Sequence, residues 1–160
     1  MLKFVKNLSM LSTTLDNLHA ANAIELLIGL LRSSVKTDPV HYREISNQVL
    51  NTMFNLCRLS KVRQEDAAVN GIIPLLQRIM KTERPPKEFA LPILCDMAHS
   101  GTVGRKYLWQ NQGIQFYASL LDDQYWQVTA LDAIFCGECF YILRVCASLT
   151  SAGFKKKLRR

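Results

Sequence analysis

Three side chains that could serve as a nucleophile, a base or metal ligands fall on one predicted helical turn, at Cys95, Asp96 and His99. Cys95 and His99 are four residues apart, which places them on the same face of a helix. A catalytic thiol needs an oriented base, and a zinc ion held by this pair would need two more ligands. The spacing supplies neither, so Cys95 is predicted to pack in the core while Asp96 and His99 face outward or cap backbone groups. The sequence therefore predicts no catalytic residue, no metal ligand and no cofactor site.

The cysteines as a group are predicted to be free thiols. A short secreted chain stapled by disulfides has an even number of them, whereas this chain has five, which favours a reducing compartment. Cys136 and Cys139 form a CxxC pair, but no second pair or HxxxH segment completes a zinc site. Buried thiols in a cytoplasmic protein are the expectation.

A polar stripe is predicted on one helix, where Asn47, Asn51 and Asn55 follow one another at intervals of four residues. Amide side chains both donate and accept hydrogen bonds, so such a stripe can bind the backbone of an extended peptide. A solvated helix face without a ligand is the alternative interpretation. Internal overlay aligns Asp96 with Asn55, and Trp126 begins a later helix, where an exposed indole would anchor a partner. These five residues form the predicted partner-binding set.

The elements that carry these residues are predicted to be helices throughout the chain. Apolar residues recur at intervals of three and four, and no segment alternates with a period of two, so strands are not expected. Phe4, Leu8, Leu11, Leu15 and Leu18 are predicted to line one packing face of a single first helix. Further helices are expected over 23–32, 42–59, 61–69, 72–80, about 89–97 and 125–135, with breaks at 33–38, Gly71, Pro85-Pro86, Gly101 and Gly104.

An internal repeat organises these helices. The segments 22–31 (NAIELLIGLL), 70–79 (NGIIPLLQRI) and 112–121 (QGIQFYASLL) superimpose when Ala23, Gly71 and Gly113 are aligned. The spacing is close to the roughly 40–47-residue period of armadillo and HEAT repeats, and a glycine permits a sharp turn between the first two helices of a unit. The predicted fold is an all-α, right-handed solenoid of about three armadillo/HEAT-like repeats. Their expected bounds are 1–59, 60–100 and 101–135, followed by a divergent segment over 136–160.

The composition describes a folded domain with a basic tail. Hydrophobic residues make up 49% of the 160 residues and charged residues 21%, which excludes a disordered chain. Of the 20 Lys and Arg residues, five lie in KKKLRR at 155–160, which leaves 15 against 13 acidic residues in the rest of the chain. The tail has three interpretations: a nuclear-import signal, a contact to phosphate or acidic lipid, or a solvated end.

Four segments resemble a known family: 51–71 (NTMFNLCRLSKVRQEDAAVNG), 72–80, 90–99 (ALPILCDMAH) and 120–134 (LLDDQYWQVTALDAI). The chain resembles, over about residues 45–135, the armadillo-like C-terminal region of fungal septation-initiation protein kinases and of the plant MAP kinase kinase kinase epsilon family. The resemblance implies a module of a cytokinesis kinase, located in the cytoplasm and at the spindle pole or division site, near a small GTPase and scaffold proteins. The Gly-rich loop, HRD loop and DFG triad of a kinase domain are missing from this sequence.

These observations predict a non-catalytic protein–protein interaction module, an armadillo-like scaffold that is not itself an enzyme. Binding of nucleic acid or an acidic membrane surface through the basic tail is the alternative function. Self-association is a further expectation, because the terminal repeats of a solenoid expose apolar faces unless they are capped.

Overall fold

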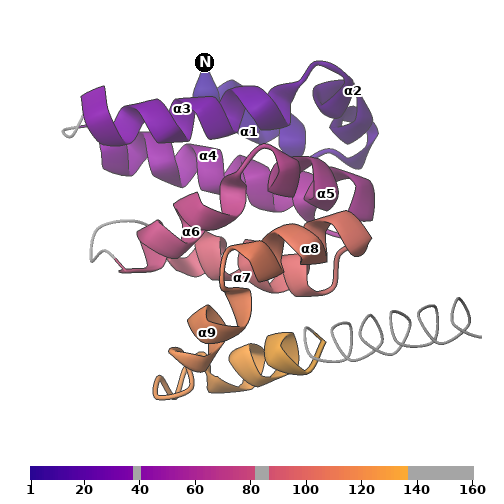
Figure 1. Ribbon diagram of the computed structural model, residues 1–160. Helices are drawn as coiled ribbons and strands as arrows, with labels where there is room; N and C mark the ends of the chain where they lie inside the picture. The colour runs from indigo at the N-terminus through magenta and orange to yellow at the C-terminus, as the bar shows by residue number, and fades with distance from the viewer. Residues whose placement is uncertain (38–40, 82–86, 137–160) are drawn as a thin grey trace, which may run out of the picture. The chain divides into compact units, whose positions relative to one another are not determined.

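The computed structural model of the protein describes residues 1–37, 41–81 and 87–136 (Figure 1). All regular elements in these ranges are helices, and no strand occurs among them, so the predicted all-α class is confirmed. The chain forms two compact units, Met1–Gly113 and a second that begins at Ile114. The first unit contains α1 (Leu2–Ser9), a 3-10 turn η1 (Ser12–Thr14), α2 (Leu15–Ala20), α3 (Ala23–Thr37), α4 (Tyr42–Cys57), α5 (Lys61–Val69), α6 (Ile72–Lys81), α7 (Lys87–Ala98) and α8 (Thr102–Gln110).

The helices of the first unit follow a recurring order of a short helix, a second helix and a third helix. α2, α3 and α4 make one such set, and α5, α6 and α7 make the next. Within each set the second helix packs against the third, and between sets α4 packs against α7 (Figure 1). The short helix α5 in turn packs against α8, and α1 packs against α4. The third helices of the two sets are therefore neighbours.

The core of the first unit lies between these helices. Fully buried side chains come from every layer: Ile24, Ile28 and Leu31 on α3, Leu50, Met53 and Leu56 on α4, Ile72, Ile73 and Leu76 on α6, and Leu91 and Ile93 on α7. The named residues of α3 and α4 are spaced three or four apart, which is the pattern of an amphipathic helix, while α6 and α7 also bury positions one or two residues apart. The 3.6-residue period that predicted the helices therefore also identifies their buried faces.

Polar contacts tie each set to the next. His19 Nε2 lies 3.1 Å from Asp66 Oδ2, and Arg63 Nη1 donates to Asp16 Oδ1 at 2.7 Å, so two contacts link α2 to α5. Glu65 Oε1 on α5 accepts from the backbone N–H of Val103 at 2.9 Å. This carboxylate caps the N-terminus of α8, where Gly101 at the N-cap has no side chain to do so.

The single first helix expected over residues 4–18 is wrong. The chain instead forms α1, the turn η1 and α2, and Phe4 and Leu11 of the predicted packing face are 65% and 55% exposed. Hydroxyl groups explain the break, because Thr14 Oγ1 donates to the backbone carbonyls of Leu8 and Leu11. Side chains that bind the backbone in this way compete with continuous helix.

Two other expected breaks are absent from the described helices. Residues 33–37 continue α3, because Ser33 and Ser34 donate their hydroxyls to carbonyls three residues earlier and so remain within the helix. Gly104 lies inside α8 and is buried, with its missing side chain leaving room for the Ser100 hydroxyl. The expected helix start at Asp38-Pro39 and the break at Pro85-Pro86 lie outside the described residues.

A short helix is followed closely by a second helix at three places, α2–α3, α5–α6 and α8–α9 (α9 is Gly113–Ala118). Each of these links contains one residue with a positive φ. These residues are Asn22 (55°), Gly71 (81°) and Gln112 (56°), each directly before the second helix. The predicted turn at Gly71 is confirmed. By backbone conformation, however, Gly71 is equivalent to Asn22 and Gln112, so the predicted alignment on Ala23 and Gly113 is one residue off.

Gln112 is expected to be strained at its position, because the left-handed region disfavours side chains other than glycine and asparagine. Replacing Gln112 by glycine should raise the free energy of unfolding by about 0.5–1 kcal/mol in urea titrations. Gln110→Gly is the matched control, because Gln110 is helical and exposed, and the same change should lower stability by a similar amount. Equal effects of the two substitutions would contradict the strain at Gln112.

The second unit contains α9 (Gly113–Ala118) except for its first residue, a series of turns, and a helical run over residues 127–136. The rings of Tyr125 and Trp126 form an edge-to-face pair with centroids 4.4 Å apart. Tyr117 is fully buried. No helix among the residues described in either unit is both long and apolar enough to span a membrane.

Candidate protein-binding surface on α4 and α7

The end of α4 is held in place by side chains of the next helix. Arg63 Nε donates to the carbonyl of Leu56 at 2.6 Å, and Gln64 Nε2 donates to the carbonyl of Cys57 at 3.0 Å. Both carbonyls belong to the last turn of α4, where intrahelical donors are missing. Ser60 meanwhile accepts from the backbone N–H of Arg63 and begins α5. The position of α4 is therefore coupled to α5 through hydrogen bonds as well as apolar packing.

The predicted asparagine stripe lies on one face of α4. Asn47 is exposed, while Asn51 and Asn55 are partly buried. Asn55 Nδ2 donates to the hydroxyl of Ser9 on α1 at 3.0 Å and lies 3.4 Å from Asn51 Oδ1. One amide of the stripe is thus engaged within the fold, which the sequence did not predict, whereas Asn47 faces solvent.

Asp96 lies on the face of α7 that is not buried against its neighbours. Its carboxyl is half-buried, and this burial raises its pKa, while the nearby His99 and Arg58 act in the opposite direction. Arg58, directly after α4, is exposed. Asp96, Arg58 and His99 therefore place groups of both signs at the junction of α4 and α7.

Aromatic side chains also bridge the two helices. The rings of Phe54 on α4 and Phe89 on α7 lie with centroids 6.1 Å apart and planes inclined at 55°. Both residues are only partly buried, so the pair contributes apolar surface beside the polar stripe. Neither Phe54, Phe89 nor Arg58 was predicted as a surface residue. The signal available for Phe54 was its spacing of three from Asn51.

Trp126 lies in the second unit and is described separately from the α4–α7 surface. Its side chain is partly buried, and it packs against Tyr125, which is 78% exposed. An aromatic pair with one exposed ring remains compatible with an anchoring role. Trp126 therefore stays a predicted contact residue, separate from the α4–α7 surface.

Cys95 and Cys57 are buried and form no disulfide, as predicted, and His99 is exposed. Burial raises the pKa of the Cys57 thiol to about 12, and nearby Asp96 also raises it, so the thiol stays protonated at neutral pH.

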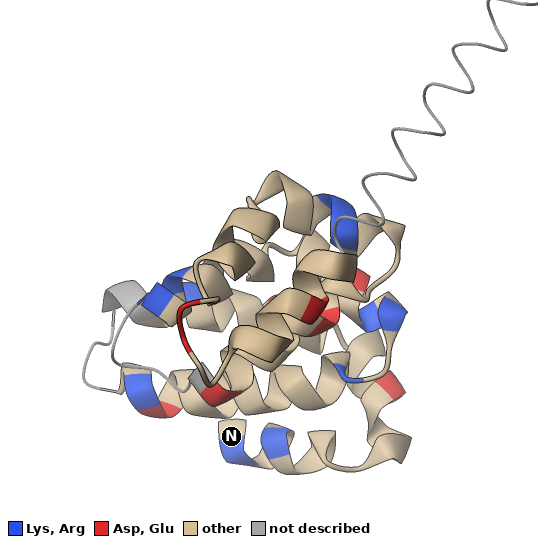
Figure 2. Ribbon diagram, turned by 90° about the horizontal axis from the view of Figure 1, so that it is seen from below, with Lys and Arg blue, Asp and Glu red and all other residues tan. Residues whose placement is uncertain are grey.

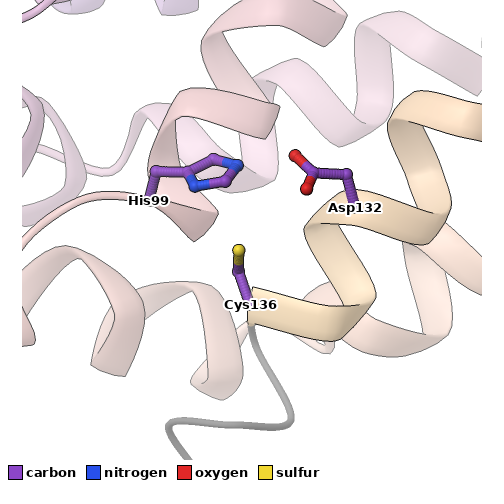
Figure 3. Close-up of side chains that lie close together, drawn as sticks. All are labelled: His99, Asp132 and Cys136. Carbon is purple, nitrogen blue, oxygen red and sulfur yellow. The ribbon is translucent and has the colours of Figure 1, made fainter.

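Figure 3 shows Asp132 and Cys136 on successive turns of the helix at 127–136 in the second unit, and His99 just after α7 in the first. Two potential ligands on one helix face do not complete a zinc site, which needs four ligands or three and an open position. Cys139 of the CxxC pair lies outside the described residues.

Charges of both signs are distributed over the helices of the first unit (Figure 2). Lys3 on α1 pairs with Glu44 on α4 at 3.1 Å, and Arg63 pairs with Asp16. A folded nucleic-acid surface normally gathers basic residues on one face. The basic segment 155–160, on which the alternative function depends, lies outside the described residues.

The chain was compared with families and with curated proteins. No family model matches it. Over 135 residues, or 84% of the chain, it is 72% identical to the cytokinesis protein sepH of Aspergillus niger. It is 46% identical over 137 residues to MAP3K epsilon protein kinase 2 of Arabidopsis thaliana, and 43% identical over 133 residues to the cell division control protein 7 of Schizosaccharomyces pombe.

The chain spans about a tenth of the length of these curated relatives. The match covers 84% of the chain in the sepH and plant comparisons, which is more than the predicted residues 45–135. The predicted resemblance is confirmed, and it extends over more of the chain than expected.

Proposed function

The chain carries a segment of the family of the sepH proteins and the MAP3K epsilon protein kinases, and we propose that it serves there as a non-catalytic, armadillo-like module for protein binding. The proposed role is regulatory, because the segment lacks the Gly-rich loop, the HRD loop and the DFG triad of a kinase domain. The partners proposed by resemblance are a small GTPase or a scaffold protein at the spindle pole or division site. The proposed compartment is the cytoplasm.

The armadillo-like arrangement is supported by three features of the first unit. Two consecutive sets have the order short helix, second helix, third helix, and a positive-φ residue precedes each second helix. The third helices α4 and α7 are neighbours, as are the short helices α5 and α8. We propose the segments 1–59, 60–100 and 101–135 as the repeat units of the solenoid.

The proposed binding surface consists of the unburied faces of α4 and α7. One observation carries the proposal: α4, which bears the Asn47–Asn55 stripe, packs against α7, and Arg58 at the end of α4 lies close enough to Asp96 on α7 to lower the pKa of that carboxyl. Amide, carboxylate and guanidinium groups can pair with the N–H and carbonyl groups of an extended chain. The Phe54–Phe89 pair adds an apolar contact, so an extended peptide with alternating polar and apolar side chains fits this chemistry.

The surface can be tested with peptides selected from a displayed random library on the wild-type chain. Asn47→Ala and Asp96→Asn are expected to weaken binding of the selected peptides by about tenfold each, since a lost hydrogen bond at a desolvated contact is worth about 1–2 kcal/mol. Fluorescence anisotropy of a labelled peptide measures the dissociation constants. Circular dichroism establishes that each variant remains folded.

Asn17→Ala on α2 provides the matched control, because Asn17 is an exposed helical asparagine far from α4 in the chain. Its affinity should equal that of the wild type. Selected peptides that bind both α4–α7 variants as tightly as the wild type would remove the assignment of this surface. The same measurement on Trp126→Ala decides whether Trp126 contributes to binding.

A further inference from the structure

Two short stretches of the described chain expose apolar side chains that a monomer would ordinarily bury. The first is the N-terminal face, formed by Phe4 on α1 and by Met10 and Leu11 directly after it. These residues are 65%, 67% and 55% exposed. α1 packs against α4 with its other side, where Ser9 is buried. The N-terminal face is therefore an outward apolar surface on the first helix of the first unit.

The second stretch is the C-terminal face, formed by Val128, Leu131 and Phe135 on the helix at 127–136, with Tyr125 just before it. Val128, Leu131 and Phe135 are spaced by three and four residues, so they share one side of the helix. Their exposed fractions are 78%, 52% and 68%, and Tyr125 is 78% exposed. Contiguous apolar surface of this kind on a folded protein marks an interaction site.

The chain segments that contain the two faces differ in the sign of their net charge. The N-terminal segment contains Lys3 and Lys6 and no acidic residue before Asp16, and in Figure 2 the helix beside the N label carries blue positions only. Residues 114–136 contain Asp122, Asp123 and Asp132 and no Lys or Arg. Like faces would bring like charges together, whereas unlike faces pair charges of opposite sign.

We propose that the N-terminal face of one chain docks on the C-terminal face of a second copy, so that the protein associates head to tail. Apolar side chains on both faces supply the burial, and the basic N-terminal segment, whose Lys3 also pairs with Glu44 on α4, meets the acidic segment 114–136. The contact is heterologous, because each copy contributes a different face. Each face is formed by one short helix and the residues next to it, so we expect a small interface and an association that is weak and depends on concentration. This contact is independent of the peptide surface on α4 and α7.

Sedimentation velocity on the full chain tests the proposal. The mean mass of the wild type should rise with protein concentration and fall with added salt, which screens the charge pairs. Phe4→Asp blocks one face and Phe135→Asp blocks the other, and each variant alone should remain a monomer at concentrations where the wild type associates. Val62→Asp, which replaces a 68% exposed residue on α5, should associate like the wild type.

Mixing the two blocked variants separates head-to-tail docking from the alternatives. Phe4→Asp retains its C-terminal face and Phe135→Asp retains its N-terminal face, so an equimolar mixture should form a 1:1 dimer and nothing larger. A mixture that stays monomeric overturns the proposal, as does a single variant that dimerises by itself through two like faces. A wild-type chain that is monomeric at every concentration would mean that residues of the same chain cover these faces, and it too would overturn the proposal.

Discussion

Replacing Leu91 by alanine is expected to lower the free energy of unfolding by about 3–4 kcal/mol. Leu91 has no exposed surface and lies on α7, which packs against α4, α6 and α8. The substitution removes buried methyl groups and leaves a cavity that three packed helices cannot all move to fill. Because a domain is typically stable by only about 5–15 kcal/mol, the loss is a large share of the total.

The measurement can be confined to the first unit by using its tryptophan. The chain has two tryptophans, Trp109 on α8 and Trp126 in the second unit, so Trp126→Phe leaves Trp109 as the reporter. Urea unfolding in this background should show a lower midpoint for Leu91→Ala. Leu26→Ala on α3 removes the same atoms from a side chain that is 69% exposed, and should change stability by less than about 0.5 kcal/mol. Similar losses for both leucines would mean that α7 does not form the centre of the core.

The existence of the helices was predictable because each one buries apolar residues at its own 3.6-residue period. The predicted segment 61–69 matches α5 in full, and the predicted helix over 42–59 ends at Cys57, two residues early. Pro74 falls in the first turn of α6, where its missing N–H has no intrahelical partner to lose. Information of this kind is local, and a single sequence contains it.

Helix breaks and repeat register were less predictable because they depend on individual polar contacts. Residues Ser33 and Ser34 suggested a break, yet their hydroxyls bind the preceding turn and α3 continues. The Thr14 hydroxyl has the opposite effect: it donates to the backbone carbonyl of Leu8, and the helix predicted from the leucine spacing is interrupted there. The positive φ at Gln112 could not be predicted from residue type, because glutamine rarely adopts this conformation. The turn was therefore predicted at the next residue, Gly113.

Only part of the candidate surface was predictable, because spacing along one helix can be read from the sequence but contacts between helices cannot. Spacing alone places Asn47, Asn51 and Asn55 on one face of α4, as found. That Asn55 donates to Ser9 depends on the packing of α1 over α4, a contact between residues 46 positions apart. The proximity of Arg58 to Asp96 likewise depends on α4 meeting α7. Long-range pairing of this kind is set by how the helices stack, and no local pattern encodes it.

Replacing Arg63 by methionine is expected to lower the free energy of unfolding by about 2–3 kcal/mol. The Arg63 side chain is only 13% exposed, and it donates both to the Leu56 carbonyl and to Asp16. Methionine keeps the apolar stem but leaves the carbonyl at the end of α4 without its charged donor. A hydrogen bond to a charged group contributes about 1.5–3 kcal/mol, and a cation at a helix C-terminus adds a few tenths more.

The contributions of the two partners of Arg63 can be separated by comparing single substitutions in urea unfolding. Asp16 is 93% exposed, so its ion pair is screened by water and Asp16→Asn should reduce stability by no more than about 1 kcal/mol. Arg63→Lys should fall between wild type and methionine, since one ammonium cannot reproduce the two directed contacts of a guanidinium. An Asp16→Asn loss as large as that of Arg63→Met would assign the effect to the ion pair. A much smaller loss would assign it to the carbonyl of Leu56, and so to the attachment of α4, with its asparagine stripe, to α5.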